Sequence, residues 1–380
     1  MIPRFKPDLD IRELIAAFSF SKKDDVKTFE EEFAKKMGQK YAIAFPYGRT
    51  GLMILLKAMG LKDKEIICPA YTCVVVPHAI VFSGNIPVFV DCKENEFNMD
   101  LDLAASYINE KTGAIIPTSL FGYPVDLDKL DYIRSRHPNI KVIQDCAHSF
   151  SAEWKGRPVH KEGDAAIFSL NISKLINSIF GGIVTTDNDE LAQKIKELRS
   201  QILKPASLMK SFRRLLYLIA VYFAFWEPLY GFVNKLERMG MLDRFVRYYD
   251  ENSIDMPEDF LEMMCNVEAR VGLVQIKKYD QIVAKHRERA ARWYEYLKNE
   301  KNIVLPPKVE GATYSHFVCL VDNRKEWLDK WRKKGVQLGQ LIEYCIPYMK
   351  AYQKYKNGEY PVALRYSKTT INFPLGGDYV

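Results

Sequence analysis

Residues 141–186 read KVIQDCAHSFSAEWKGRPVHKEGDAAIFSLNISKLINSIFGGIVTT, and the rest of the chain can be organised around them. Three short runs in this stretch are rich in β-branched or aromatic residues and predict strands at 141–144, 165–170 and 182–186. Each run ends in a polar residue or follows a tight turn. Because ligands of α/β sheets bind at the carboxyl ends of strands, these ends predict a ligand site.

Polar side chains gather at the ends of the first two predicted strands. Asp145 closes the first strand and His148 follows it, whereas Ser169, Asn171 and Lys174 follow the second. A lysine close to an aspartate is the pair that pyridoxal phosphate chemistry needs. The amine bonds to the cofactor aldehyde, and the carboxylate keeps the pyridinium nitrogen protonated. Each residue alone would be a turn residue, a cap or a surface group, so the hypothesis rests on their joint spacing.

Three blocks of this stretch together resemble the DegT/DnrJ/EryC1/StrS family of sugar aminotransferases. They are DCAH at 145–148, SLNISK at 169–174 and GGIVTT at 181–186. Their order and spacing follow the family patterns E-D-A-A-Q/H, S-F-H/N-x-x-K and G-G-x-V/L-x-T. The resemblance implies the fold-type I architecture, with pyridoxal 5'-phosphate as cofactor and Lys174 as the catalytic residue that bonds to it.

An earlier turn predicts an anion site. The run YAIAFPYGRTGLMILL at 41–56 reads as a strand, a tight turn at Gly48 and a helix from about Thr50. A helix that starts at such a turn offers unpaired N–H groups to an anion. The resemblance implies that Gly48, Arg49 and Thr50 hold the cofactor phosphate. Arg49 stands where the family usually has threonine, so we expect its charge to serve the phosphate or to bind substrate.

The residue that would stack on the cofactor ring departs from the family pattern. PAYTC at 69–73 resembles the family's P-x-x-T-F/W, and Cys73 occupies the position of the aromatic residue. We expect Cys73 to be a buried small residue rather than a nucleophile, and Tyr71 to replace the missing ring. The full cofactor-binding set that the resemblance implies is Gly48, Arg49, Thr50, Tyr71, Asp145, His148, Ser169, Asn171 and Lys174.

Strand-like and helix-like runs alternate with short links through the first half of the chain. This alternation predicts a mostly parallel sheet with helices on both faces. A chain of 380 residues is too long for one small core. We therefore predict a large cofactor-binding domain at 1–204, an apolar helical insertion at 205–254, and a part at 255–380 that holds a long linking helix and a smaller α+β domain.

The apolar segment contains twelve consecutive apolar or aromatic residues at 215–226, with basic residues on both sides. A helix that spans a membrane needs about twenty, so this run is too short for a single crossing. Three interpretations fit it. It forms a buried helical hairpin at a subunit interface, it contacts a membrane surface through residues 205–247, or it covers an apolar substrate. We expect the family resemblance to exclude this segment and to cover residues 25–200 and 255–376.

A long helix is predicted around residues 260–299, and a second departure precedes it. The family often places an asparagine there that reaches the partner subunit's cofactor phosphate, whereas this chain has Leu261 at that position. Together with Cys73, this departure supports a rival hypothesis. In that hypothesis the chain is a membrane-associated or regulatory protein that keeps the fold without turnover.

Composition limits the partners of the chain. The net charge is +7, with 55 basic and 48 acidic residues, which suits anionic partners. Nucleic-acid binding is not expected, because the sequence shows no basic run and no nucleic-acid-binding motif. Seven cysteines without a Cys-x-x-Cys pair predict neither disulfides nor a metal site and fit a reducing cytoplasm. The N-terminal residues lack an apolar signal region, so export is not expected.

The resemblance also implies the reaction and the assembly. An amino acid, with glutamate as the expected donor, gives its amino group to a keto sugar, with a nucleotide-linked sugar as the expected acceptor, for the synthesis of amino sugars and envelope polysaccharides. Lys174 then serves as general base and acid. A homodimer is the expected form. The expected location is the cytoplasm, with the inner face of the membrane as the alternative if residues 205–247 contact lipid. The main rival enzyme is a pyridoxal phosphate enzyme that acts on a non-sugar carbonyl or an amino acid.

Overall fold

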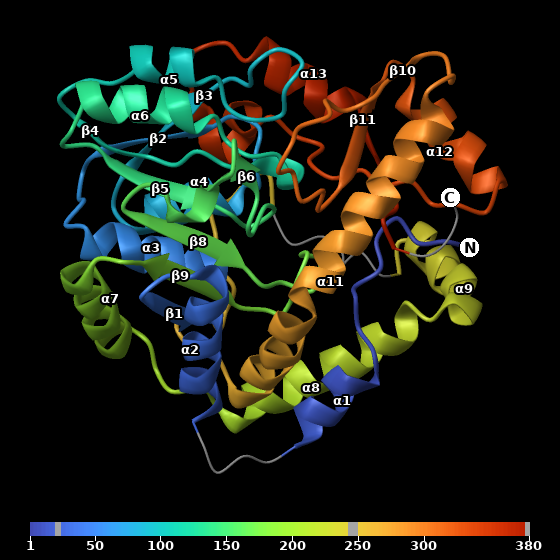
Figure 1. Ribbon diagram of the computed structural model, residues 1–380, viewed down its shortest axis with the longest axis horizontal. Helices are drawn as coiled ribbons and strands as arrows, with labels where there is room; N and C mark the ends of the chain where they lie inside the picture. Colours follow the sequence, from blue (N-terminus) through green and yellow to red (C-terminus); the bar gives the residue numbers. More distant parts are fainter. Residues whose placement is uncertain (20–23, 242–249, 377–380) are drawn as a thin grey trace.

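A seven-stranded sheet forms the centre of the molecule in the computed structural model, which describes residues 1–19, 24–241 and 250–376 (Figure 1). Its spatial order is β1-β9-β8-β5-β4-β2-β3. The strands are β1 (Tyr41–Phe45), β2 (Glu65–Pro69), β3 (Ile86–Val90), β4 (Thr112–Ile115), β5 (Lys141–Asp145), β8 (Ala165–Ser169) and β9 (Gly182–Thr186). All neighbours pair in parallel except β9, which is antiparallel to both β1 and β8. The mostly parallel sheet is thereby confirmed.

The three strands predicted from residues 141–186 are neighbours in the sheet. In the register of the parallel pair β5 and β8, Asp145 lies opposite Ile167. Strand β8 ends two residues later, at Ser169. Because both strands run in the same direction, their carboxyl ends meet at one edge. The side chains that follow them are therefore brought together, as the sequence predicts.

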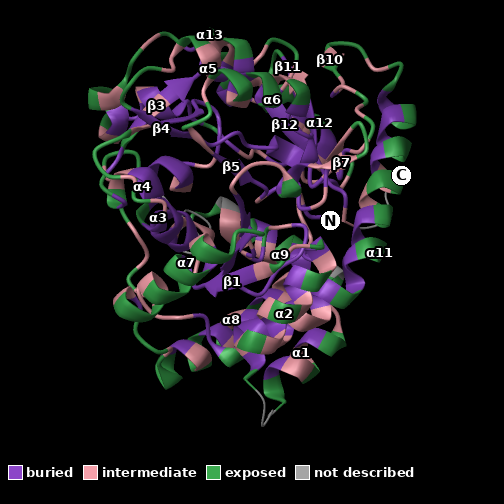
Figure 2. Ribbon diagram, turned by 60° about the vertical axis from the view of Figure 1, so that its left-hand side comes forward, coloured by how far each residue is buried: buried purple, intermediate pink, exposed green. Residues whose placement is uncertain are grey.

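Helices cover both faces of the sheet because its strands are apolar on both sides. In β1, Ile43 and Phe45 belong to one buried cluster, and Ala42 and Ala44 belong to the other. The first cluster includes residues of α3 (Gly48–Ala58), α4 (Val75–Phe82) and α7 (Asp189–Ile202). The second includes residues of α2 (Asp25–Met37), α5 (Leu101–Ser106) and α6 (Leu127–Arg136). In Figure 2 the strands are buried, while the outer faces of the helices are exposed.

The long helix α11 (Asn266–Leu297) crosses the molecule from the sheet towards the C-terminal part (Figure 1). It begins six residues later than predicted. Its first turn is fixed by Glu268, whose carboxylate accepts a hydrogen bond from the Cys265 backbone N–H at 2.9 Å. Leu261 lies before the helix, and its carbonyl oxygen accepts a backbone hydrogen bond from Lys204.

The C-terminal part is built around a small antiparallel sheet. It contains β10 (Ile303–Val304), β11 (Phe317–Val321) and β12 (Thr370–Phe373), with the helices α12 (Arg324–Lys333) and α13 (Pro361–Thr369). Tyr352 and Tyr366 from this part are buried in the same cluster as Phe45 of β1. The large and small parts therefore share one apolar core. A two-stranded hairpin, β6 (Glu153–Trp154) with β7 (Arg157–Pro158), completes the strands.

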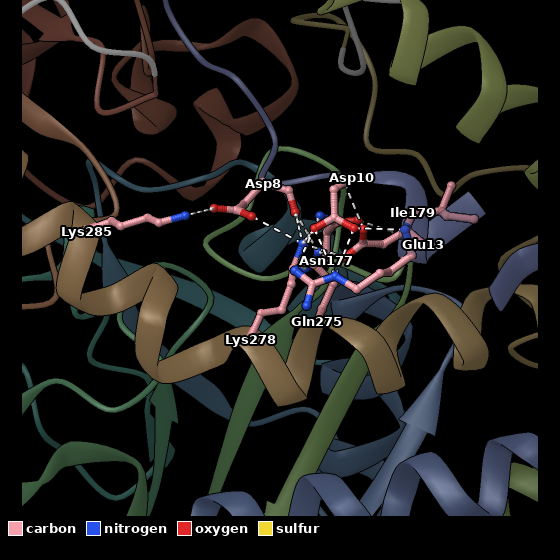
Figure 3. A network of polar contacts seen from close by, with 9 residues as sticks. Asp8, Asp10, Glu13, Asn177, Ile179, Gln275, Lys278 and Lys285 are labelled. Atoms are coloured by element: carbon pink, nitrogen blue, oxygen red, sulfur yellow. Dashed lines mark hydrogen bonds and ion pairs between the residues drawn. The ribbon is translucent and has the colours of Figure 1, made fainter. Parts of the chain in front are cut away.

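The N-terminal segment is tied down by a polar network on α11 (Figure 3). Helix α1 (Ile11–Phe18) is capped by Asp10 and presents the buried Glu13 to α11. The Lys278 ammonium lies 2.7 Å from the Glu13 carboxylate and 3.2 Å from the carboxylates of Asp8 and Asp10. Gln275 donates hydrogen bonds to the Asp8 carbonyl and to Glu13, both at 2.7 Å. These contacts hold the segment against the middle of α11.

The apolar segment forms two helices, α8 (Leu208–Ala224) and α9 (Glu227–Arg238), which meet at a bend of 109°. The inner side of α8 buries Lys210, Arg214, Leu218 and Val221. Its outer side exposes apolar side chains, among them Leu208, which is 91% exposed. Within the described residues no single helix is long and apolar enough to cross a membrane, whereas α8 and α9 together have the length and apolar composition for it, by these two criteria alone. Residues 242–247, which the prediction assigned to the same segment, lie outside the described residues.

Candidate active site

A cavity of about 360 Å³ lies at the carboxyl ends of β5 and β8. Seven of the nine predicted cofactor-binding residues line it: Gly48, Arg49, Asp145, His148, Ser169, Asn171 and Lys174. The other two, Thr50 and Tyr71, are not among its lining residues. The motif blocks, which are separated in sequence, thus converge on a single cavity.

Lys174 lies in the loop that connects β8 to β9. This loop closes on itself, because the Leu170 N–H donates to the Gly181 carbonyl and the Ser178 N–H donates to the Leu170 carbonyl. Loss of hydration in the cavity lowers the pKa of the Lys174 amine below its ordinary value, while Cys73 and Asp145 oppose this shift. A larger share of the amine is therefore neutral near pH 7, as a nucleophile requires.

Asp145 is buried, with 3% of its surface exposed. One carboxylate oxygen accepts a hydrogen bond from the Thr118 hydroxyl at 3.1 Å, and the other accepts from the Ala147 backbone N–H at 3.0 Å. Burial raises the pKa of Asp145, whereas these hydrogen bonds and the Lys174 charge act in the opposite direction. The carboxylate is thus held in a fixed orientation, but its charge is incompletely compensated. Thr118 was not part of the sequence-based prediction.

His148 is held in one tautomer. The Phe121 backbone N–H donates to His148 Nδ1 at 3.3 Å, so a neutral ring carries its proton on Nε2. Burial lowers the pKa of His148 well below its ordinary value, with further contributions from Lys174 and His316. Phe121 has a left-handed backbone, with φ of 56°, which is uncommon for a residue other than glycine. The ring is therefore a neutral hydrogen-bond donor.

His316 comes to the same region from the C-terminal part, and the sequence analysis did not identify it. Its ring centroid lies 5.1 Å from that of His148, and its Nδ1 is 3.0 Å from the Ser315 hydroxyl. Burial lowers the pKa of His316 to about 3. No local sequence pattern indicated His316, because its position depends on a contact between the two parts of the chain.

The N-terminus of α3 faces the cavity through Gly48 and Arg49. Tyr47 precedes the helix and makes no side-chain cap hydrogen bond, so the first turn keeps N–H groups for an anion. The chain approaches closely here, because a Cβ atom on Gly182 would lie 2.3 Å from the Gly48 nitrogen. Arg49 lines the cavity and pairs with no carboxylate among the described residues. This end of the cavity suits a phosphate group.

Thr50 and Tyr71 require correction, since the structure places neither of them against the cavity. Helix α3 begins at Gly48 rather than near Thr50. Thr50 is therefore inside the first turn, fully buried, and its hydroxyl donates to the Phe260 carbonyl at 3.1 Å. Tyr71 is also fully buried, with its hydroxyl 3.1 Å from that of Thr370 and its ring against Phe121 and Tyr366. The Tyr71 ring therefore packs away from the residues that line the cavity.

Several lining residues were not predicted from the sequence. Thr72 is buried in the cavity wall, and its hydroxyl bonds to no other described group. Tyr47 and Phe180 line the cavity near α3, and a short run, Asp255, Met256 and Pro257, covers it from the segment before α11. These residues carry no motif of their own, and only the fold brings them together.

The donor set fits pyridoxal phosphate. The cavity offers a partly buried lysine amine, a buried carboxylate that needs a cationic partner, the start of a helix with an unpaired arginine, and an unbonded hydroxyl of Thr72. A ring nitrogen, an aldehyde and a phosphate would each find a complementary group. Among the described residues no group of three or more His, Cys, Asp or Glu side chains is arranged to hold a metal ion.

Comparison with known proteins agrees with this geometry. The family model described as the DegT/DnrJ/EryC1/StrS aminotransferase family matches residues 8–221 and 227–379. The match therefore includes most of the segment that was expected to be an insertion outside the family, which corrects that expectation.

Two curated relatives are GDP-perosamine synthases. The one from Caulobacter vibrioides is 32% identical over 283 residues, which cover 74% of this chain and 64% of the relative. The one from Escherichia coli O157:H7 is 27% identical and covers 98% of this chain and 93% of the relative. Among solved structures, the PLP form of the sugar aminotransferase Spr1654 from Streptococcus pneumoniae, itself described as putative, superposes with a TM-score of 0.77. It is 20% identical and covers 100% of this chain and 94% of that one. The fold is therefore that of the fold-type I aminotransferases, and the chain belongs to the DegT/DnrJ/EryC1/StrS aminotransferase family.

Proposed function

We propose that this protein is a pyridoxal-phosphate-dependent aminotransferase that moves an amino group from an amino acid to a keto sugar. The observation that supports this most strongly is the cavity in which Lys174, the oriented Asp145 and the start of α3 meet. A protein that kept the fold without turnover would have no need of a lysine amine with a lowered pKa in a cavity that also holds a buried carboxylate. This arrangement favours the enzyme over the regulatory alternative.

The residues divide the chemistry among them. Bound pyridoxal phosphate would supply the aldehyde that accepts the amino group and the electron-withdrawing ring. Lys174, with its lowered pKa, takes the proton from the substrate α-carbon and returns it as general acid. Asp145 holds a proton on the ring nitrogen, and His148 donates from Nε2 to an acceptor in the cavity. Gly48, Arg49 and Ser169 bind the phosphate end.

The sugar substrate is proposed from the relatives. Two of them are named GDP-perosamine synthase, and another, from Aneurinibacillus thermoaerophilus, is named dTDP-3-amino-3,6-dideoxy-alpha-D-galactopyranose transaminase. A nucleotide-linked keto sugar is therefore the proposed acceptor, glutamate the proposed donor, and amino-sugar synthesis for polysaccharides the proposed role. The unpaired Arg49 offers a partner for a phosphate or a carboxylate of either substrate.

Absorbance spectroscopy tests this proposal. Purified protein incubated with pyridoxal phosphate should show a band of covalently bound cofactor that shifts when glutamate is added. Lys174→Ala should lack both the band and the shift, and the exposed Lys111→Ala should behave as the wild type. If the wild-type protein shows no band at any cofactor concentration, the proposal is wrong. If the band forms but does not respond to any amino acid, the protein is not a transaminase.

We also propose that the protein works in the cytoplasm as a homodimer. The support is its similarity to enzymes of nucleotide-sugar metabolism, whose acceptors are charged and water-soluble, together with seven free cysteines. Light scattering of the purified protein should give twice the mass of the chain. A monomer that carries out the full reaction would contradict the proposed assembly.

The outer surface of α8 and α9 supports a further proposal, contact with an anionic membrane surface. Nineteen large apolar side chains are exposed in the described residues, of which ten lie at 208–241 and three in the neighbouring α1. Lys210 and Arg214 of α8 face inwards, but Lys204, Arg213 and Lys235 are exposed in this segment, and α8 contains no acidic residue. Exposed apolar residues beside basic charge are typical of helices that bind lipid interfaces.

Flotation with vesicles tests this contact. The wild-type protein should float with vesicles rich in phosphatidylserine and less with phosphatidylcholine alone. Phe212→Ser combined with Leu216→Ser, on the outer side of α8, should abolish flotation without changing the oligomeric state. If the double variant instead becomes monomeric while its flotation is unchanged, this surface is an interface between two copies of the chain. None of the residues that line the cavity comes from α8 or α9, so the substrate-lid interpretation is not supported.

A further inference from the structure

Arg214 links the apolar segment to the cavity. It lies on the inner side of α8 and is 8% exposed. Its guanidinium donates to the Glu268 carboxylate at 2.8 Å, to the Tyr47 hydroxyl at 2.8 Å and to the Asp259 carboxylate at 2.6 Å. It also lies over the Phe180 ring, 4.3 Å from the centroid. One side chain of α8 thus connects to four other segments of the chain.

Two of these partners line the cavity. Tyr47 is the residue that precedes α3, and Phe180 directly precedes Gly181 in the Lys174 loop. The two rings meet edge to face, with centroids 5.9 Å apart, and the backbones of Tyr47 and Gly181 form a parallel β-bridge. Tyr47 makes no cap hydrogen bond to α3, so its side chain is held by this ring contact and by the contacts of its hydroxyl with Arg214 and Asp259.

The same network fixes the segment that covers the cavity. Asp259 accepts from the Tyr47 hydroxyl at 2.5 Å as well as from Arg214. The next residue, Phe260, accepts from the Thr50 hydroxyl inside α3. The Lys210 ammonium adds a contact with the Asp259 carboxylate at 3.5 Å. The run 255–257 is therefore anchored to the start of α3 by the residues that follow it.

We propose that Arg214 and Tyr47 are positioning residues that hold the start of α3 in place for the cofactor phosphate. The Tyr47 hydroxyl, fixed between Arg214 and Asp259, sets the backbone that leads into Gly48 and Arg49. Helix α8 therefore serves the site without touching it. This inference rests on the proposed function, since it concerns the phosphate end of the proposed cofactor.

The test compares two ligands that differ only by the phosphate. Equilibrium binding of pyridoxal 5'-phosphate and of pyridoxal is measured by absorbance for the wild type, Tyr47→Phe and Arg214→Lys. Both variants should bind the phosphorylated form about three- to tenfold more weakly, as the loss of one or two oriented hydrogen bonds implies. Binding of pyridoxal should change by less than about twofold, because its contacts with Lys174 and Asp145 remain.

Controls separate this role from a general effect on folding. Arg213→Lys changes the exposed neighbour of Arg214 on α8, and Tyr217→Phe removes a hydroxyl from another ring that packs on Phe180; both should bind as the wild type. If Tyr47→Phe and Arg214→Lys weaken both ligands equally, or weaken neither, the inference is wrong. If the wild type binds neither ligand, the proposed function itself fails. Arg214→Ala is unsuitable because it would leave the fully buried Glu268 without its cation.

Discussion

Asp145 is a residue whose function and stability requirements oppose each other. Burial makes ionisation of its carboxyl group costly, so its pKa lies above the ordinary value of 3.8. Below pH 3.8 both states are protonated and the group does not affect stability. As the pH rises from 3.8 to the raised pKa, the unfolded state loses its proton first, so the free energy of unfolding falls and stays lowered at higher pH. The chain retains a charge that its surroundings disfavour.

Asp145→Asn should therefore separate the two properties. We expect the cofactor-free variant to melt at the same temperature as the wild type or higher at pH 7, since the amide keeps the hydrogen-bonding shape without the charge. Transamination should fall by about 10²-fold or more, because an amide cannot hold the ring nitrogen protonated. Calorimetry and steady-state kinetics measure both. A variant that is much less stable at pH 7 would contradict this account of the site.

His316 gives the opposite pH dependence. Its pKa is lowered from 6.5 to about 3, so the folded state disfavours the protonated ring. The unfolded state binds a proton first as the pH falls, and stability is lost between about pH 6.5 and pH 3, at about 1.4 kcal/mol per unit of pKa difference. His316→Gln should flatten this part of the profile in urea unfolding measured at several pH values. An unchanged slope would show that the proton binds elsewhere.

Motif spacing was sufficient for Lys174 and its neighbours because the blocks lie on adjacent strands. It was insufficient for Tyr71, because whether its ring faces the cavity depends on packing against Phe121 and Tyr366. Cys73, which was expected to be buried, is only partly buried and lines the cavity. His316 was missed for a related reason. Its contact with His148 joins the two parts of the chain, and no local pattern records such a contact.

At the scale of elements, the loop that carries Lys174 depends on α11. Gln275 is fully buried on that helix. Its carbonyl oxygen accepts from the backbone and the side-chain amide of Asn177, both at 3.3 Å. Its amide nitrogen donates to Glu13 of α1. The Gln275 side chain therefore links α1 and its own helix α11 to the loop that carries Lys174.

Gln275→Ala should lower the free energy of unfolding by about 2–3 kcal/mol, because Asn177 loses two hydrogen bonds, and the Asp8 carbonyl and the buried Glu13 lose one each. Gln193→Ala is the matched control. Gln193 is exposed on α7 and donates a hydrogen bond to the exposed Glu197 one turn later, so the change should be less than about 0.5 kcal/mol. Urea unfolding measures both variants, and similar losses in the two would refute the role assigned to Gln275.

The bounds of most elements followed from apolar periodicity, whereas those of α8 did not. The predicted apolar run begins at Leu215, but the helix begins seven residues earlier, at Leu208. Lys210 and Arg214 appeared to be basic flanking residues, yet both point inwards to acidic partners. A basic residue that faces the core cannot be recognised before its acidic partners are located.

At the scale of the whole molecule, one apolar core extends across the predicted domain division. Phe45 and Ile66 of the sheet belong to the same buried cluster as Tyr352 and Tyr366. Alternating strands and helices predicted the sheet, but they gave no indication that the C-terminal residues return to pack on it. The division at residues 204 and 254 remains a prediction.

Calorimetry should accordingly show a single unfolding transition for the cofactor-free protein, with equal calorimetric and van't Hoff enthalpies. Parts that share a core cannot melt one after the other without exposing the same side chains twice. The measurement is a temperature scan at several protein concentrations, which also separates dissociation of subunits from unfolding. Two transitions that persist at all concentrations would indicate that the parts fold independently.

The contacts of the N-terminal segment have a consequence for biosynthesis. Asp10 leaves the ribosome long before Lys278, which follows it by 268 residues. Until then the acidic side chains of Asp8, Asp10 and Glu13 have no counter-charge from α11, so α1 cannot dock during most of translation. Leu9, Leu14 and Ala17, which pack in the folded protein in one apolar cluster with residues of α11, are uncovered on the nascent chain until then and are available to ribosome-associated chaperones. Docking of α1 is therefore a late step, which follows the synthesis of the long helix α11.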